Sequence, residues 1–471
     1  MKKTITMNSR RKILMLAAAA MSAGIVPILG KADDDDSHDR YDDELKYKSA
    51  NNTTFAPANT GLTGKIVVIG GGMAGVTVAK YLRLWGGTGI QVTLVEPSLT
   101  YTSNIMSNLV LNNSRSVSSL AYGYTTIAAK YGVAVRQAAV QSIDTAAKSV
   151  VLSDGTLLAY DRLVVAPGVD FMDAYGLTQS DYDTRTPHAW RAGPQTELLR
   201  SQLAAMPSNG TFVMTIPKAP YRCPPGPYER ACLVADYLKT YKGAASKVIV
   251  LDENASIQAE VESFSYAFNT VHRGVIDYQA GVSNIQVNPI TKVVSFTDAV
   301  GAVSTLNANT VNPIPAHRAA GSNNGGWLAN AGLNNSADGR WCLVDVLNYE
   351  STAIAGVHVI GDAASCGLPK AGHVANQEAK ICADAIIRVL AGQSPDPAPV
   401  ANSACYSPIT ASTASWLTAV YQYDAGTRKM LLAANGGQTV GARATESASI
   451  SATNFRQMNT WFNSLMGDSF A

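Results

Sequence analysis

The chain has 471 residues, of which 46% are hydrophobic and 15% charged, so it has enough apolar side chains for two or three compact domains. This composition excludes a mainly disordered chain. The formal net charge is only +2 and no arginine- or lysine-rich stripe is present, which argues against nucleic acid as a partner.

Residues 1–32 are predicted to be an export signal. The paired Arg10 and Arg11 precede an apolar run, 13–29, that is shorter than the roughly 20 apolar residues of a membrane-spanning helix. Paired arginines are typical of a twin-arginine signal, and a Sec signal with two chance arginines is the alternative. No later segment is apolar over a spanning length, so we expect a periplasmic chain without a transmembrane segment.

Residues 33–63 begin with the acidic stretch "DDDDSHDRYDDE". Like charges at this density repel one another and stay hydrated, so we predict a flexible arm. Calcium binding is the alternative, but the stretch lacks the spacing of a calcium loop.

From residue 64 onward, short buried strands alternate with helices. The strands "KIVVI", "QVTLV" and "RLVVA" are separated by helical or mixed segments, and "TFVMTI" and "KVIVLD" form a second such unit. This alternation predicts an α/β fold with two Rossmann-like, doubly wound domains. An amphipathic helix is expected near the C-terminus, where Phe455, Met458, Phe462 and Leu465 have helical spacing.

A glycine turn follows the first strand. Gly70, Gly72 and Gly75 have the G-x-G-x-x-G spacing, and Glu96 ends the next strand about 20 residues further on. Such glycines let a backbone approach a pyrophosphate, and the acid suits a ribose hydroxyl pair. We predict a dinucleotide site, with a ligand-free structural turn as the alternative.

Two later segments resemble landmarks of the two-dinucleotide-domain flavoproteins with a glutathione-reductase-like fold. They are "VVAPG", at 164–168, and "GVHVIGDAA", which contains Gly361 and Asp362. The resemblance implies FAD as cofactor. It assigns these residues to the flavin site: Ala166, Gly168, Gly361, Asp362 and, at the start of the next helix, Gly372.

These landmarks divide the rest of the chain into four parts. We predict a split FAD domain at 64–180 and 312–394, a central NAD-like domain at 181–311, and a C-terminal α+β interface domain at 395–471. In the central domain the turn after "TFVMTI" reads "PKAPYRC" and holds prolines and Cys223 in place of glycines. Proline removes amide donors, so we expect no nicotinamide site there.

Several strings are similar to the flavoprotein subunit of flavocytochrome c sulfide dehydrogenase. They are "PHAWRAG", "YRCPPGPYERA", "RWCLVDVLNYEST", "VIGDAA", "CYSP" and "WFNSLMGDSFA". The resemblance implies a redox disulfide between Cys223 and Cys342 beside the flavin. Because Cys342 precedes Asp362 on the FAD side of the sequence, we assign it as the flavin-facing sulfur and Cys223 as the entry sulfur. The resemblance also implies sulfide as electron donor and a c-type cytochrome as acceptor. A disulfide that only staples an exported protein is the alternative.

Two further residues match positions of the family. Glu229 is a candidate for the substrate proton, and a surface partner for Arg222 or Arg230 is its alternative role. Trp461 is expected near the flavin, and simple helix packing is the alternative. Family members often bind the flavin through a cysteine after the second strand. Asn104 stands at that place here, so we predict non-covalent FAD.

The remaining cysteines and histidines carry weaker signals. Cys232 and Cys382 lie among apolar residues and are expected to be buried, whereas Cys366 and Cys405 pair or remain free. No haem-attachment motif is present, and none of the six histidines has metal-ligand spacing, so we predict no metal. Two alternative functions remain: a sulfide:quinone reductase and an accessory flavin-binding subunit of a sulfur-oxidising complex.

Overall fold

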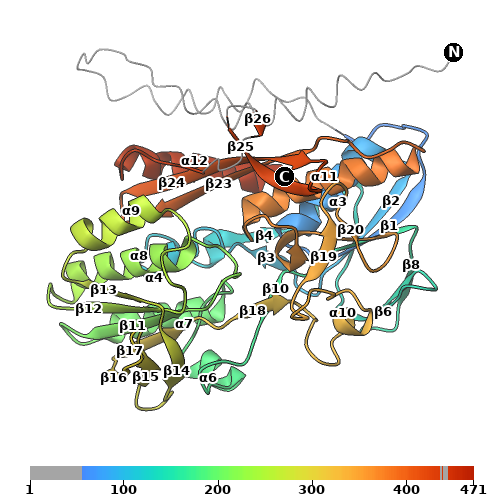
Figure 1. Cartoon of the computed structure of the whole chain (residues 1–471). Helices are drawn as coiled ribbons and strands as arrows, with labels where there is room; N and C mark the ends of the chain where they lie inside the picture. The colour runs from blue at the N-terminus through green and yellow to red at the C-terminus, as the bar shows by residue number, and fades with distance from the viewer. Residues whose placement is uncertain (1–55, 435–436, 439–443) are drawn as a thin grey trace, which may run out of the picture. The chain divides into compact units, whose positions relative to one another are not determined.

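The computed structural model describes residues 56–434, 437–438 and 444–471 (Figure 1). The predicted signal and most of the predicted acidic arm lie outside these residues. Residues 59–471 form one compact unit. No helix in the described ranges is long and apolar enough to cross a membrane.

The first α/β part is built on an eight-stranded sheet. Its order is β22 (Ala364–Ser365), β19 (Cys342–Asp345), β20 (Glu350–Ser351), β21 (Val357–Val359), β9 (Arg162–Val165), β1 (Gly64–Ile69), β2 (Ile90–Val95) and β5 (Ala134–Arg136). The strands from β21 to β5 pair in parallel. Strands β1 and β9 are nearly continuous buried apolar runs because the sheet is covered on its faces, whereas the edge strand β5 is mostly exposed.

Two long helices pack against each other on this sheet. They are α3 (Met73–Gly86) and α11 (Gly372–Leu390), shown in blue and orange in Figure 1. A small antiparallel sheet lies between β5 and β9 in sequence and consists of β6 (Val140–Asp144), β7 (Ser149–Leu152) and β8 (Leu157–Ala159). The two halves of the predicted FAD domain therefore share one sheet.

The second α/β part has a four-stranded parallel sheet. Its order is β13 (Ile276–Ala280), β12 (Lys247–Asp252), β11 (Thr211–Ile216) and β17 (Thr310–Pro313). The helices with it are α4 (Asn108–Leu111), α7 (Pro194–Ala205), α8 (Gly226–Tyr241) and α9 (Val261–Tyr266), and an antiparallel sheet of β14 (Ser283–Val287), β15 (Val293–Thr297) and β16 (Val303–Asn307) adjoins it. Because β17 pairs with β11, the central sheet continues to residue 313, two residues beyond the predicted end of the central domain at 311.

The C-terminal part is an antiparallel sheet with one helix. Its strands are β23 (Val400–Pro408), β24 (Ala414–Asp424), β25 (Lys429–Ala434), β26 (Gly437–Gln438) and β27 (Thr445–Glu446), followed by α12 (Ala452–Phe470). Strand β23 contacts both α11 and α8, and α12 contacts α3. The C-terminal part thus joins the two α/β parts, as the red strands in Figure 1 show.

Shorter elements complete the chain. They are β3 (Thr100–Thr102), β4 (Ala121–Gly123), α5 (Thr125–Tyr131), β10 (Val169–Phe171), α6 (Gln179–Thr184), β18 (His317–Ala319) and α10 (Trp327–Asn330). The predicted fold class is confirmed: two Rossmann-like parts and a C-terminal α+β part. The predicted amphipathic helix is α12, in which Met458, Phe462 and Leu465 are buried.

Candidate functional site

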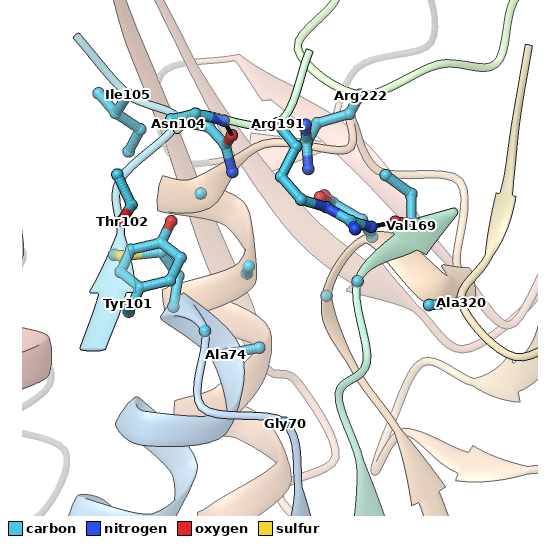
Figure 2. Close-up of a pocket in the computed structure, with 18 of the residues that line it drawn as sticks. Gly70, Ala74, Tyr101, Thr102, Asn104, Ile105, Val169, Arg191, Arg222 and Ala320 are labelled. Carbon is cyan, nitrogen blue, oxygen red and sulfur yellow. Dashed lines mark hydrogen bonds between the residues drawn. The ribbon is translucent and has the colours of Figure 1, made fainter. Parts of the chain in front are cut away.

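A cavity of about 760 Å³ lies where the three parts meet. Its lining comes from the glycine turn, the turn before α8, strand β23 and helix α12. Figure 2 shows Gly70 and Ala74 at one end and Asn104, Arg191 and Arg222 at the other. The volume is in the range of small-molecule and cofactor pockets.

The glycine turn is shaped so that side chains are excluded. Gly70 has φ +99°, and a Cβ there would lie 2.2 Å from the carbonyl oxygen of Ala166. A Cβ on Gly75 would lie 1.8 Å from the carbonyl oxygen of Gly70, so α3 can pack on the turn only with glycine. Gly72 differs, because a Cβ there would meet only a Tyr101 ring atom at 3.8 Å. Gly72 therefore faces open space in the cavity, where a cofactor phosphate would fit.

Glu96 follows β2 and lines the cavity beside this turn. Its Oε2 accepts from the Gly71 amide at 2.7 Å, and its Oε1 accepts from the Ser98 amide at 2.9 Å. These bonds fix the carboxylate at the carboxyl edge of the sheet, where ligands of such folds bind.

The two flavoprotein landmarks, at 164–168 and around Asp362, also line the cavity. Ala166, Gly168, Gly361, Asp362 and Gly372 all contribute to the lining. Gly372 is the first residue of α11, whose N-terminal amides therefore point toward the cavity. All five of these residues therefore lie at the cavity, and their role in binding FAD stays a prediction.

Two cations lie near Asp362. Burial raises the pKa of this carboxyl, whereas Arg222 and Lys370 act in the opposite direction. The Arg222 Nη2 is buried and has no hydrogen-bond partner among the described residues. An unpaired guanidinium nitrogen in a cavity of this size indicates a missing anionic or polar ligand. The site therefore fits a dinucleotide cofactor such as FAD.

Cys223 lies in the turn before α8 and faces the cavity. Its φ is +59°, a left-handed conformation that is uncommon for a residue other than glycine. The Cys223 amide donates to the Lys370 carbonyl at 2.7 Å, and a Cβ on Gly226 would lie 2.8 Å from the Cys223 sulfur. Burial raises the pKa of the thiol to about 12. The turn therefore holds one sulfur rigidly at the cavity wall.

A second sulfur, that of Cys405 on β23, also lines the cavity. Burial raises the pKa of Cys405 well above its usual range, and the charge of Cys223 raises it further. The two sulfurs are therefore electrostatic neighbours. Sequence analysis left the role of Cys405 open, although the "CYSP" string already marked its position.

Cys342 has a different location. It begins β19, is fully buried and pairs in register with Ala364. It is not among the described residues that line the cavity. Lys370 lies close to both Cys223 and Cys342, the two cysteines of the predicted disulfide. Its carbonyl oxygen accepts a hydrogen bond from the Cys223 amide, and its charge acts to lower the pKa of Cys342. All six cysteines are free thiols here, and the Cys223–Cys342 disulfide stays a prediction.

Glu229 is buried at the cavity wall, one turn into α8. Its Oε1 accepts from the Asn108 amide nitrogen at 2.8 Å, and burial raises its pKa to about 8. Arg230 donates to the same Asn108, to Asn312 and to the carbonyls of His188 and Ala189, so Asn108 bridges the guanidinium and the Glu229 carboxylate. Glu229 is thus a buried acid at the cavity rather than a surface partner of an arginine.

Trp461 on α12 lines the cavity and packs against His373 and Tyr406. Its indole Nε1 is buried without a partner among the described residues. Cys232 and Cys382 are fully buried, as predicted, and the Cys366 sulfur donates to Glu378.

Asn104 occupies the position at which members of the family often carry the cysteine that binds the flavin covalently. It lines the cavity, and its Oδ1 accepts from the Ala192 amide at 2.9 Å. Sequence reasoning missed Asn108, Arg222 and Lys370, which are held at the site only by tertiary contacts.

Comparison with known families agrees with this geometry. Residues 64–199 match the family described as pyridine nucleotide-disulphide oxidoreductase. Residues 196–315 match the central part of the sulfide dehydrogenase [flavocytochrome c] flavoprotein chain, and residues 397–470 match the flavocytochrome c sulphide dehydrogenase flavin-binding family.

Fold, site and matches define the chain as an FAD flavoprotein with two dinucleotide-fold domains. In its central and C-terminal parts the chain is similar to the flavoprotein chain of flavocytochrome c sulfide dehydrogenase.

Curated relatives match over short segments. The ferredoxin–NAD(+) reductase component of the p-cumate 2,3-dioxygenase system from Pseudomonas putida is 41% identical over 112 residues, which are 22% of this chain and 26% of the relative. Ferroptosis suppressor protein 1 from Taeniopygia guttata is 30% identical over 106 residues, 22% and 27% of the two chains. The chain therefore spans about a quarter of the length of these relatives.

Among solved structures, the sulfide:quinone oxidoreductase of Aquifex aeolicus is similar with a TM-score of 0.67. The two share 16% identity, and the match covers 86% of this chain and 91% of that one. At this identity the likeness shows the fold alone.

Proposed function

We propose that this chain is an exported FAD-dependent sulfide dehydrogenase that oxidises hydrosulfide at Cys223 and passes electrons to a c-type cytochrome. The observation that carries the proposal is a cavity that joins a dinucleotide cradle to Cys223, Cys405 and a buried acid, Glu229. The family matches support the same chemistry.

The first step is thiol–disulfide chemistry at Cys223. Hydrosulfide attacks the Cys223 sulfur of a disulfide, so that a new S–S bond forms and the old one breaks. Cys223 then carries a persulfide, and the second cysteine leaves as a thiolate with the electron pair. When bound, FAD would supply a two-electron acceptor for this pair that can return the electrons singly to a haem acceptor. The persulfide S–S bond then breaks with its electron pair left on Cys223, and the outer sulfur passes as zero-valent sulfur to a nucleophile such as a second hydrosulfide. The Cys223 thiolate re-forms the disulfide with the second cysteine, which has given up its electron pair.

The second sulfur is either Cys342 or Cys405. Sequence resemblance favours Cys342, whereas Cys405 is favoured because it lines the cavity together with Cys223. We therefore assign Cys405 as the first candidate and keep Cys342 as the alternative. The left-handed turn at Cys223 holds its sulfur in place for either partner.

Glu229 would take up the substrate proton. It lies near Cys223, since its charge raises the pKa of that thiol, and it is buried away from bulk water. A raised pKa of about 8 lets the carboxylate accept a proton near neutral pH and release it afterwards.

The residues that would hold FAD are those of the cradle: the glycine turn, Glu96, Asp362, the start of α11 and Trp461. Because Asn104 replaces the flavin-linking cysteine and no cysteine precedes Cys223, we propose that FAD is bound non-covalently. Acid precipitation would then leave the flavin in the supernatant, and a yellow pellet would contradict this.

Anaerobic addition of sulfide to the FAD-loaded protein tests the function. We expect rapid bleaching of the flavin in the natural chain and none in Cys223→Ser. Cys405→Ser and Cys342→Ser then separate the two partners, because only the true partner abolishes bleaching. An unchanged spectrum in the natural chain would overturn the enzyme proposal and favour the accessory role.

The electron acceptor needs its own test. We expect reduced holoenzyme to be reoxidised faster by cytochrome c than by a soluble quinone. The reverse order would support the sulfide:quinone reductase alternative. Export is supported by the paired Arg10 and Arg11, and replacing both with lysine should retain the chain in the cytoplasm.

A further inference from the structure

A second buried carboxylate lies behind the cavity wall. Glu260, just before α9, is 1% exposed, and its two oxygens accept from the hydroxyls of Ser407 and Ser415. Within the described ranges no basic side chain forms an ion pair with it. A buried acid without a cation is expensive as an anion and is favoured as a protonated group.

Strand β23 connects this acid to the cavity. Ser407 lies two residues after Cys405, so both side chains are on the same face of the strand. Ser407 also pairs in register with Ser415 on β24. Because α8 packs against β23, Glu229 of α8 faces the same region, and the charge of Glu260 raises the pKa of Glu229.

On its other side, Glu260 approaches the surface. Glu446 on β27 is partly exposed, and its charge raises the pKa of Glu260. Its carboxylate accepts from the amide and the hydroxyl of Ser263, three residues after Glu260. Ser407, on the face of β23 that carries Cys405, thus links Glu260 to the cavity wall, and Ser263, three residues after Glu260, links the same loop to the partly exposed Glu446.

The backbone at Glu260 is strained. Its φ is +51°, in the left-handed region, where a glutamate is uncommon. Such strain persists only where the surrounding contacts hold it, and it gathers at functional positions. Burial raises the pKa of Glu260 to about 7, which suits exchange of a proton near neutral pH. The other titratable groups that influence this region are Cys405 on β23 and Cys232 on α8.

We propose that Glu260, with Ser407 and Ser415, relays protons from Glu229 at the cavity to Glu446 at the surface. The proposal rests on the proposed function. Oxidation of one hydrosulfide to zero-valent sulfur releases two electrons and one proton, and the electrons go through FAD to a one-electron acceptor. The proton moves along the carboxylates to water, and only O–H bonds form and break on the way.

Turnover of the holoenzyme with sulfide and ferricyanide, a one-electron acceptor, tests the relay. In weak buffer with a pH indicator, Glu260→Gln should slow proton release and kcat about tenfold or more, with the sulfide KM unchanged. The matched control is Glu262→Gln, which removes an exposed acid in the first turn of α9 and should change the rates less than about twofold. Glu260→Asp should restore part of the rate. Equal rates in Glu260→Gln and the natural chain would overturn the proposal.

Infrared difference spectroscopy of the resting holoenzyme gives a readout that needs no turnover. We expect carboxylic-acid absorbance that titrates between about pH 7 and 8, from Glu229, Glu260 and Glu378, and the Glu260 component should be lost in Glu260→Gln. A Glu260 carboxyl that titrates like an exposed glutamate, near pH 4.3, would overturn the relay. If Glu260→Gln does not fold, Ser407→Ala with Ser415→Ala serves instead, with the same expected rates. An unbleached flavin in the natural chain refutes the proposed function, whereas normal bleaching with no effect at Glu260 refutes the relay alone.

Discussion

The glycine turn offers a pair of substitutions whose outcomes should differ. In Gly72→Ala the new methyl group meets only Tyr101, at 3.8 Å, and the backbone (φ −78°) accepts alanine. The fold should therefore be unaffected, while the methyl group occupies the space where a pyrophosphate approaches the backbone. Overpacking of this kind costs about 1–3 kcal/mol, so the Kd for FAD should rise roughly 5- to 150-fold.

Gly75→Ala should behave in the opposite way. Its Cβ would lie 1.8 Å from the Gly70 carbonyl oxygen, which only a shift of α3 or of the turn relieves. We expect the FAD-free protein itself to lose stability, by about 3 kcal/mol or more.

The assay titrates FAD into each FAD-free variant by flavin fluorescence and records thermal unfolding beside it. Two results would refute this reasoning: natural FAD affinity in Gly72→Ala, or a Tm loss in Gly72→Ala as large as that in Gly75→Ala.

Three further predictions follow from buried charges. Burial raises the pKa of Glu229 to about 8, and the proposed mechanism needs its carboxylate form. The kcat at saturating sulfide should therefore rise with pH up to about 8 in the natural chain, and this rise should be absent in Glu229→Gln. The same pH profile in both proteins would contradict the role of Glu229. Burial raises the pKa of Glu260 in the folded chain from 4.5 to about 7, so folding favours the protonated form. The free energy of unfolding of the natural chain, relative to that of Glu260→Gln, should therefore fall by about 3 kcal/mol between pH 4.5 and 7. Urea titrations that give the same pH dependence for both proteins would argue against a buried protonated acid. Asp468→Asn leaves Lys380 buried without its partner at 2.8 Å, so urea unfolding should show a loss of about 3 kcal/mol; a loss below about 1 kcal/mol would mean that the pair contributes little.

The sequence predicted features that depend on local pattern. Five strands of the two parallel sheets are short apolar runs, and the glycine turn has a fixed spacing, so both can be recognised without tertiary information; the strands are β1, β2, β9, β11 and β12. Gly70, Gly72 and Gly75 follow from this spacing, whereas Gly168, Gly361, Asp362 and Gly372 were assigned through the resemblance to two-dinucleotide-domain flavoproteins. All of them except the packing residue Gly75 line the cavity.

Residues that depend on contacts between distant elements could not be predicted in this way. Cys342 and Cys405 are equivalent in a bare sequence, and only the pairing of β23 with β24 and its packing on α8 bring Cys405 to the cavity. Glu260 lies in a polar stretch that resembles a surface loop, yet two serines of the C-terminal sheet bury it. Arg222 and Lys370 likewise gain their roles from the cavity around them.

Mass spectrometry of the FAD-loaded protein, after anaerobic treatment with one equivalent of sulfide and rapid alkylation, tests the sulfur chemistry most directly. We expect one additional sulfur atom on Cys223 and an alkylated, formerly disulfide-bonded cysteine at Cys405 or Cys342. A Cys223 without added sulfur, or the added sulfur on a cysteine outside the cavity such as Cys382, would contradict the proposed chemistry.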